Sequence, residues 1–202
     1  MKKILILTSA VLLTSPAFSY YNPGTDDIRL YIGASIAYSG TEYASTGEYA
    51  DALKEFDEEY ADLSINFGTK INKYFGIEAF ILGSSPCELE ISGPTYKYSS
   101  ELSYGAFGAN AIGYLPVNDT FEFIASVGVA QYDFTHEYDN TELGVRDNGD
   151  ESSDETAFSF GIGIMFNINE HFSILGKYEY VGIDHKWFDT MSKFALCARY
   201  TF

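Results

Sequence analysis

Residues 158–167 read FSFGIGIMFN, and this stretch decides the fold class. Every second side chain from Phe158 to Phe166 is apolar, and the positions between them are small or polar, with Met165 as the exception. A period of two places the apolar side chains on one face of an extended strand. We therefore expect a β-strand with one apolar face here.

The same alternation recurs along the chain and predicts eight strands. Their expected ranges are 27–39, 58–71, 74–86, 97–115, 120–134, 155–167, 171–184 and 190–202. The connections alternate between long segments and short turns, in the order 40–57, 72–73, 87–96, 116–119, 135–154, 168–170 and 185–189. Short turns on one side and long loops on the other are typical of an outer-membrane barrel. The sequence thus predicts an all-β fold, an eight-stranded antiparallel up-and-down transmembrane β-barrel.

The N-terminus has the plan of a secretory signal peptide. Two lysines precede an apolar run at 4–13, and a small-x-small cleavage site follows at 17–19. An apolar run of this length is too short to cross a bilayer as a helix. We expect residues 1–19 to be removed and residues 20–202 to form a barrel in the outer membrane of a Gram-negative-type bacterium.

The composition excludes two classes of protein. A formal net charge of −17 at pH 7 argues against a basic surface for nucleic acid, so we expect no nucleic-acid partner. Cys87 and Cys197 are the two cysteines of the chain, which argues against a disulfide framework. Aromatic residues fall near the strand ends, and those that face outward are expected to form girdles at the membrane interfaces.

Charged residues recur on the polar faces of the predicted strands. An unpaired buried charge costs several kcal/mol, so the core of a soluble sandwich could not hold them. A barrel of eight strands has an interior just wide enough for side chains to fill, and there the charges can pair. We therefore expect a closed lumen whose candidate ion-pair residues are Arg29, Lys70, Glu78, Glu122, Lys177, Glu179, Lys193 and Arg199.

These features resemble a known family. The signal peptide, the eight alternating strands, the short Asn-rich turns and the ending ARYTF at 198–202 look like the small outer-membrane barrels related to the transmembrane domain of outer membrane protein A. The resemblance implies that the C-terminus carries the signal read by the barrel-assembly machinery. The residues that fit this signal are Leu196, Ala198, Tyr200 and Phe202.

Two of the long connections are strongly acidic. Residues 42–59 carry a net charge of −6 and residues 133–155 a net charge of −8. In one interpretation, Ca²⁺ or Mg²⁺ bridges these acids to lipopolysaccharide phosphates. In the other, they form a solvated loop that its charge keeps off the membrane. The run DNGD at 147–150 lacks the spacing of a calcium loop, so no metal site is assigned.

The sequence is compatible with three functions. The leading hypothesis is a non-enzymatic barrel with a closed, charge-paired lumen and acidic extracellular loops that serve envelope integrity or surface interaction. The first alternative is a small porin for ions or small solutes. The second is a lipid-modifying enzyme, for which His185 and Ser192, near Asp184 and Asp189, are the only candidate set. We expect no enzymatic activity and no cofactor.

Overall fold

The computed structural model describes residues 28–43, 59–92, 96–142, 145–183 and 188–202. These residues form strands and turns, and no helix among them is long and apolar enough to cross a membrane. The strands are β1 (Arg29–Tyr43), β2 (Glu59–Lys70), β3 (Phe75–Ser84), β4 (Cys87–Ser92), β5 (Tyr96–Pro116), β6 (Phe121–Glu142), β7 (Val145–Asn167), β8 (Phe172–Gly182) and β9 (Phe188–Thr201).

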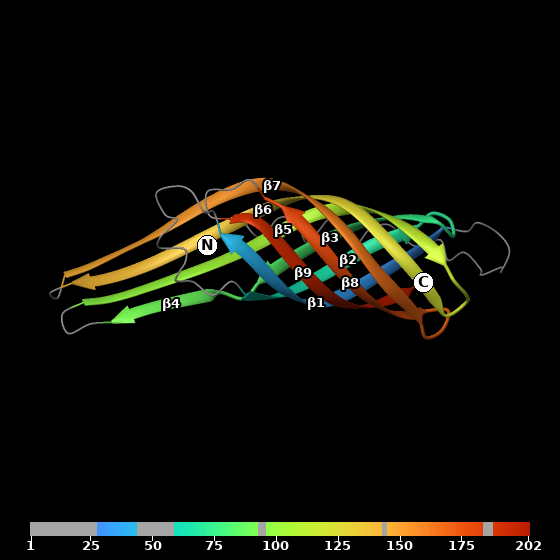
Figure 1. The fold of residues 1–202 in the computed structure, drawn as a ribbon, viewed down its shortest axis with the longest axis horizontal. Helices are drawn as coiled ribbons and strands as arrows, with labels where there is room; N and C mark the ends of the chain where they lie inside the picture. The colour runs from blue at the N-terminus through green and yellow to red at the C-terminus, as the bar shows by residue number, and fades with distance from the viewer. Residues whose placement is uncertain (1–27, 44–58, 93–95, 143–144, 184–187) are drawn as a thin grey trace.

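The strands close into a barrel (Figure 1). Every pairing is antiparallel, and neighbours follow the order β3-β2-β1-β9-β8-β7-β6-β5-β4. β3 also pairs with β5, which joins the two ends of the sheet. Because β3 and β4 lie on successive parts of β5, they fill a single position, and the ring has eight strands. The predicted fold class is confirmed.

The short turns at one end share a local motif. They read INKYF at 71–75, VNDTF at 117–121 and INEHF at 168–172. In each turn the asparagine Oδ1 accepts hydrogen bonds from the backbone N–H groups two and three residues later, at 2.8–3.0 Å. The asparagine thus satisfies donors that the turn would otherwise leave unpaired.

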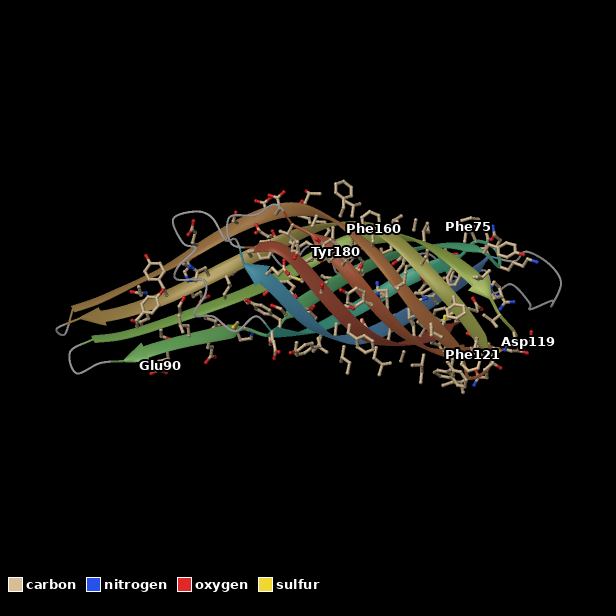
Figure 2. All side chains as sticks on the ribbon, viewed as in Figure 1. Phe75, Glu90, Asp119, Phe121, Phe160 and Tyr180 are labelled. Carbon is tan, nitrogen blue, oxygen red and sulfur yellow. The ribbon has the colours of Figure 1, made fainter. Side chains whose placement is uncertain are left out.

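The outer surface of the barrel is apolar, as a lipid-facing surface requires. On β7 the side chains of Phe158, Phe160, Ile162, Ile164 and Phe166 all point outward and are exposed. Figure 2 shows Phe75 and Phe121 near the end that carries the short turns, while Glu90 lies far toward the other end. Phe121 and Phe166 pack against each other there, with ring centroids 5.1 Å apart.

The strands on one side of the barrel are longer than the sequence pattern predicts. The expected loops at 87–96 and 135–154 are largely strand, because β4, β5, β6 and β7 continue as a paired sheet. Figure 1 shows this sheet extending well beyond the ends of β1 and β9. A strand outside the membrane needs no apolar face. The charged residues of these extended strands therefore led to the prediction of loops. The expected acidic loop 42–59 lies mostly outside the described residues.

Candidate functional site

Ion pairs lie in the barrel interior at several heights. Among the described residues they include Lys70–Glu122 (2.6 Å), Arg199–Glu78 (2.6 Å), Lys177–Glu179 (3.1 Å) and Lys193–Asp62 (3.1 Å). The two central pairs are the most enclosed, since all four of their side chains are at most 4% exposed. The other two pairs are partly accessible, and Lys70 is 20% exposed.

The carboxylate of Glu78 on β3 accepts hydrogen bonds from side chains on four other strands. The donors are Arg199 at 2.6 Å, Tyr31 at 3.1 Å, Asn66 at 3.2 Å and Asn110 at 3.4 Å. The guanidinium of Arg199 also lies 4.5 Å from the centre of the Tyr31 ring. Saturation with donors offsets the cost of burying the charge.

The Tyr31 ring needs space that a neighbouring glycine provides. A Cβ at Gly68, directly opposite Tyr31 on β2, would collide with this ring. Gly68 is therefore part of the arrangement that lets Tyr31 reach Glu78.

A second buried centre lies nearer the extracellular side. Asp62 accepts hydrogen bonds from Ser39 at 2.6 Å and from the Tyr104 hydroxyl at 2.7 Å, beside its ion pair with Lys193. The ammonium of Lys193 lies 4.9 Å from the Tyr104 ring centre and 5.2 Å from that of Tyr132. Both buried cations are thus held by a carboxylate and by tyrosine rings, an arrangement that favours a fixed cation.

Apolar side chains fill the barrel beyond this second centre. The buried cluster consists of Tyr60, Cys87, Leu102, Tyr104, Ala106, Ala130, Tyr132, Phe134, Ala157, Val181, Ile183 and Met191. Phe134 and Met191 have no exposed surface. Buried apolar side chains thus occupy the extracellular end of the lumen.

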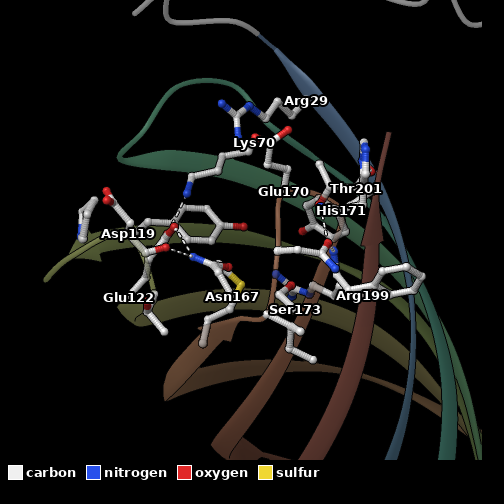
Figure 3. Close-up of a pocket in the computed structure, with 18 of the residues that line it drawn as sticks. Arg29, Lys70, Asp119, Glu122, Asn167, Glu170, His171, Ser173, Arg199 and Thr201 are labelled. Atoms are coloured by element: carbon white, nitrogen blue, oxygen red, sulfur yellow. Dashed lines mark hydrogen bonds and ion pairs between the residues drawn. The ribbon is translucent and has the colours of Figure 1, made fainter. Parts of the chain in front are cut away.

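The described residues enclose a large and a small cavity inside the barrel. The larger, about 790 Å³, opens at the end with the short turns and is lined by Lys70, Glu122, Asn167 and Arg199 among others. Figure 3 shows Lys70 reaching Glu122, whose other oxygen accepts a hydrogen bond from Asn167. The smaller cavity, about 50 Å³, lies in the centre and is also lined by Arg199. The Arg199–Glu78 pair therefore stands between the two.

The eight predicted interior residues all lie on the lumen side. Seven take part in the four ion pairs, and Arg29 lines the large cavity. Asp62, the partner of Lys193, lies within the predicted strand 58–71 but was not included among the candidate interior residues. Asp62 lies on the same face of the strand as Ser64 and Asn66, whereas the apolar Leu63 and Ile65 lie on the opposite face. This alternation could have placed Asp62 inside the barrel.

The sequence pattern left open which tyrosines face inward. Tyr31, Tyr104, Tyr114 and Tyr132 are buried in the lumen and therefore do not belong to the outward girdles. Outward tyrosines do occur, for example Tyr180.

The four residues of the expected assembly signal point outward along β9 and its end. Leu196, Ala198, Tyr200 and Phe202 are exposed on the lipid-facing side. The Tyr200 ring packs edge-on against Phe172 at 5.0 Å and Phe202 at 5.3 Å. Their role in recognition by the assembly machinery stays a prediction.

The extracellular sheet has one strongly acidic face. Strand register places Glu88, Glu101, Glu137 and Asp150 directly opposite one another across β4, β5, β6 and β7. None of the side chains described on this face is basic. We call it the acidic face, and its acidic residues are Glu88, Glu90, Glu101, Asp133, Glu137, Asp139, Asp150 and Asp154.

Like charges in directly opposed positions destabilise a sheet, so a row of four carboxylates suggests a role in recognition rather than in folding. The described residues hold no group of three or more His, Cys, Asp or Glu placed to bind a metal ion. Bridging of these acids to lipopolysaccharide by divalent cations therefore stays a prediction.

The candidate catalytic residues do not form a described site. His185 and Asp184 lie outside the described residues, and the Ser192 hydroxyl accepts a hydrogen bond from Tyr178 at 3.0 Å. The extracellular sheet contains another serine–histidine pair, with Ser100 Oγ 2.6 Å from His136 Nε2. Ser100 is 1% exposed, so a substrate could not reach its hydroxyl in this conformation.

Comparison with known proteins agrees with this architecture. The family model described as "outer membrane protein beta-barrel domain" matches residues 5–202. A sequence search of curated proteins gave no match.

Several solved structures share the fold. Ail of Yersinia pestis, in complex with the heparin analogue sucrose octasulfate, is 16% identical, with a TM-score of 0.56 over 87% of this chain and 99% of its own. Neisserial surface protein A is 11% identical, with a TM-score of 0.58 over 86% and 97%. A major outer membrane protein of Thermus thermophilus is 11% identical, with a TM-score of 0.56 over 87% and 99%. At these identities the likeness concerns the fold alone.

Proposed function

The chain belongs to the family of outer membrane protein β-barrel domains, and on that premise we propose that it is a non-conducting, non-enzymatic barrel that presents its extracellular sheet to a surface partner. The protein is located in the outer membrane. The observation that carries the proposal is the contrast between a filled lumen and a protruding, acidic sheet.

The filled lumen argues against the porin hypothesis. A small-solute path would have to pass the Arg199–Glu78 pair, the Lys193–Asp62 pair and the apolar cluster around Phe134. A pore needs continuous water, whereas the central cavity measures about 50 Å³, room for very few water molecules.

The charge of the sheet indicates the kind of partner. Eight carboxylates on one face favour a basic partner and repel polyanions. The related Ail structure holds a polyanion, so we propose that the two proteins differ in what they bind at the surface.

Purified protein in planar bilayers should show no steady conductance above that of the bare membrane. The reason is that the two buried ion pairs and the apolar cluster interrupt the water path through the lumen. A large, steady conductance that persists in different preparations would instead support the porin hypothesis.

Trimming the sheet should separate surface interaction from envelope integrity. Thr135 and Ser152 face each other in the β6–β7 ladder, so residues 135–152 can be replaced by a two-residue turn above an intact barrel. Cells that display this variant should lose attachment to surfaces and to one another, and should keep their resistance to detergent. The reverse outcome, intact attachment with detergent sensitivity, would assign the protein to envelope integrity.

A further inference from the structure

β7 has a long open edge outside the membrane. Its pairing with β8 begins only at Phe158, whereas its pairing with β6 runs from Val145. Residues 145–157 therefore have a neighbouring strand on one side only, within the part of the chain that the structure describes. In Figure 1 this part of β7 forms the margin of the extended sheet.

The register shows which backbone groups face the open edge. Asn167 donates its N–H to Thr120 on the β6 side, and Ile168 donates its N–H to Phe172 on the β8 side. Neither ladder contains a register shift. The backbone N–H and C=O groups of odd-numbered residues of β7 therefore point toward β6 along the whole strand, and those of even-numbered residues point away from it. The N–H and C=O groups of residues 146, 148, 150, 152, 154 and 156 thus point to the open edge.

An edge of this kind is a template for strand addition. It is long, it lacks proline, and it contains no bulge. Nothing in its backbone therefore prevents another strand from pairing with it.

The side chains of the edge define the charge of the incoming strand. Asp150 and Glu151 are adjacent and point to opposite faces, and Asp154 and Glu155 repeat the arrangement four residues later. A second copy of this chain, paired edge to edge, would set acid against acid, which destabilises a sheet. The charges thus select against self-association and favour a basic strand.

Resting on the proposed surface function, we propose that residues 145–157 of β7 bind an extended, basic segment of a partner protein by antiparallel or parallel strand addition. The matching segment carries two adjacent lysines or arginines, two intervening residues, and two more basic residues. This spacing places one basic side chain opposite each of the acids Asp150, Glu151, Asp154 and Glu155. The pattern reads the same in both directions, so it fits either orientation.

Two synthetic peptides test the spacing. The matched peptide is Val-Thr-Lys-Lys-Thr-Val-Lys-Lys-Thr-Val, and the control has the same composition in the order Lys-Val-Lys-Thr-Val-Thr-Lys-Thr-Lys-Val, with all lysines on one face. Binding to the folded full barrel in uncharged detergent is measured by fluorescence anisotropy at physiological salt. The matched peptide should bind about tenfold more tightly, because it gains two more opposed charge pairs.

Two double variants of equal charge separate edge binding from general attraction. Asp150→Asn with Asp154→Asn removes two acids from the edge, and Glu101→Gln with Glu137→Gln removes two from the central strands. The first should abolish the preference for the matched peptide, and the second should leave it intact. An equal loss in both would overturn strand addition in favour of unspecific charge attraction.

Hydrogen exchange gives a readout that charge alone does not produce. In the free protein, backbone amides of odd residues between 148 and 156 should be protected by β6 and those of even residues should exchange freely. The matched peptide should protect the even amides, and Ser152→Pro should weaken binding because it removes one edge donor without touching the β6 ladder. Unchanged exchange of the even amides would refute the proposal, and loss of attachment on trimming would still support the surface function.

Discussion

Replacing Glu78 by glutamine is expected to lower the free energy of unfolding by about 3–5 kcal/mol. The substitution keeps the size of the side chain and leaves Arg199 charged, buried and without its carboxylate. Arg199 borders the large cavity but is only 4% exposed, against 20% for Lys70, so water compensates much less for the lost partner. Reversible unfolding by urea in phospholipid vesicles, followed by circular dichroism, measures the change.

Glu122→Gln is the matched control. It removes the partner of Lys70, which is 20% exposed and borders the large cavity at the barrel end. Water can solvate Lys70 there, so we expect a loss of about 1 kcal/mol or less. The double variant Glu78→Gln with Arg199→Gln should recover part of the loss, because no unpaired charge remains.

The comparison of Glu78→Gln with Glu122→Gln also tests whether the centre of the lumen contains water. If Glu78→Gln and Glu122→Gln were equally mild, both cations would be in contact with water and the central barrel would be wet. That outcome would weaken the proposal of a non-conducting barrel, whereas a large difference supports a dry centre.

The barrel could be predicted from the sequence because the membrane imposes a strict rule on it. Outward positions such as Ile162 and Leu196 must be apolar, and inward positions such as Lys193 and Arg199 are free to be charged. Strand parity therefore located the interior charges. It did not give their partners, because which residues meet across the lumen depends on barrel closure and stagger, not on local pattern.

The extracellular sheet could not be predicted from the same rule. Beyond Phe158 no lipid demands an apolar face, so the alternation fades into acids, serine and threonine. What holds this region in strand form is the continued ladder with β5 and β6, which is a tertiary property. Which tyrosines face the lumen could not be decided for a related reason, since tyrosine suits both a membrane interface and a polar interior.

Arginine in place of Ile162 should destabilise the folded barrel by about 2–4 kcal/mol in a bilayer. Ile162 is 66% exposed and is the middle residue of the outward apolar row from Phe158 to Phe166 on β7. This position places it near the centre of the lipid-facing band, where a guanidinium meets hydrocarbon and loses its water. Unfolding in vesicles measures the cost, as for Glu78.

Ser152→Arg on the same strand and the same face is the matched control. Ser152 is exposed on the extracellular sheet between Asp150 and Asp154, so arginine there stays in water beside two carboxylates. Its effect should be close to zero or slightly stabilising, because surface ion pairs contribute about 1 kcal/mol at most. Both variants add one arginine to β7, so the difference between their free energies of unfolding reflects the depth of the side chain in the membrane. A similar cost at both positions would mean that the band from Phe158 to Phe166 does not face lipid, and the assignment of inside and outside along the barrel would have to be reversed.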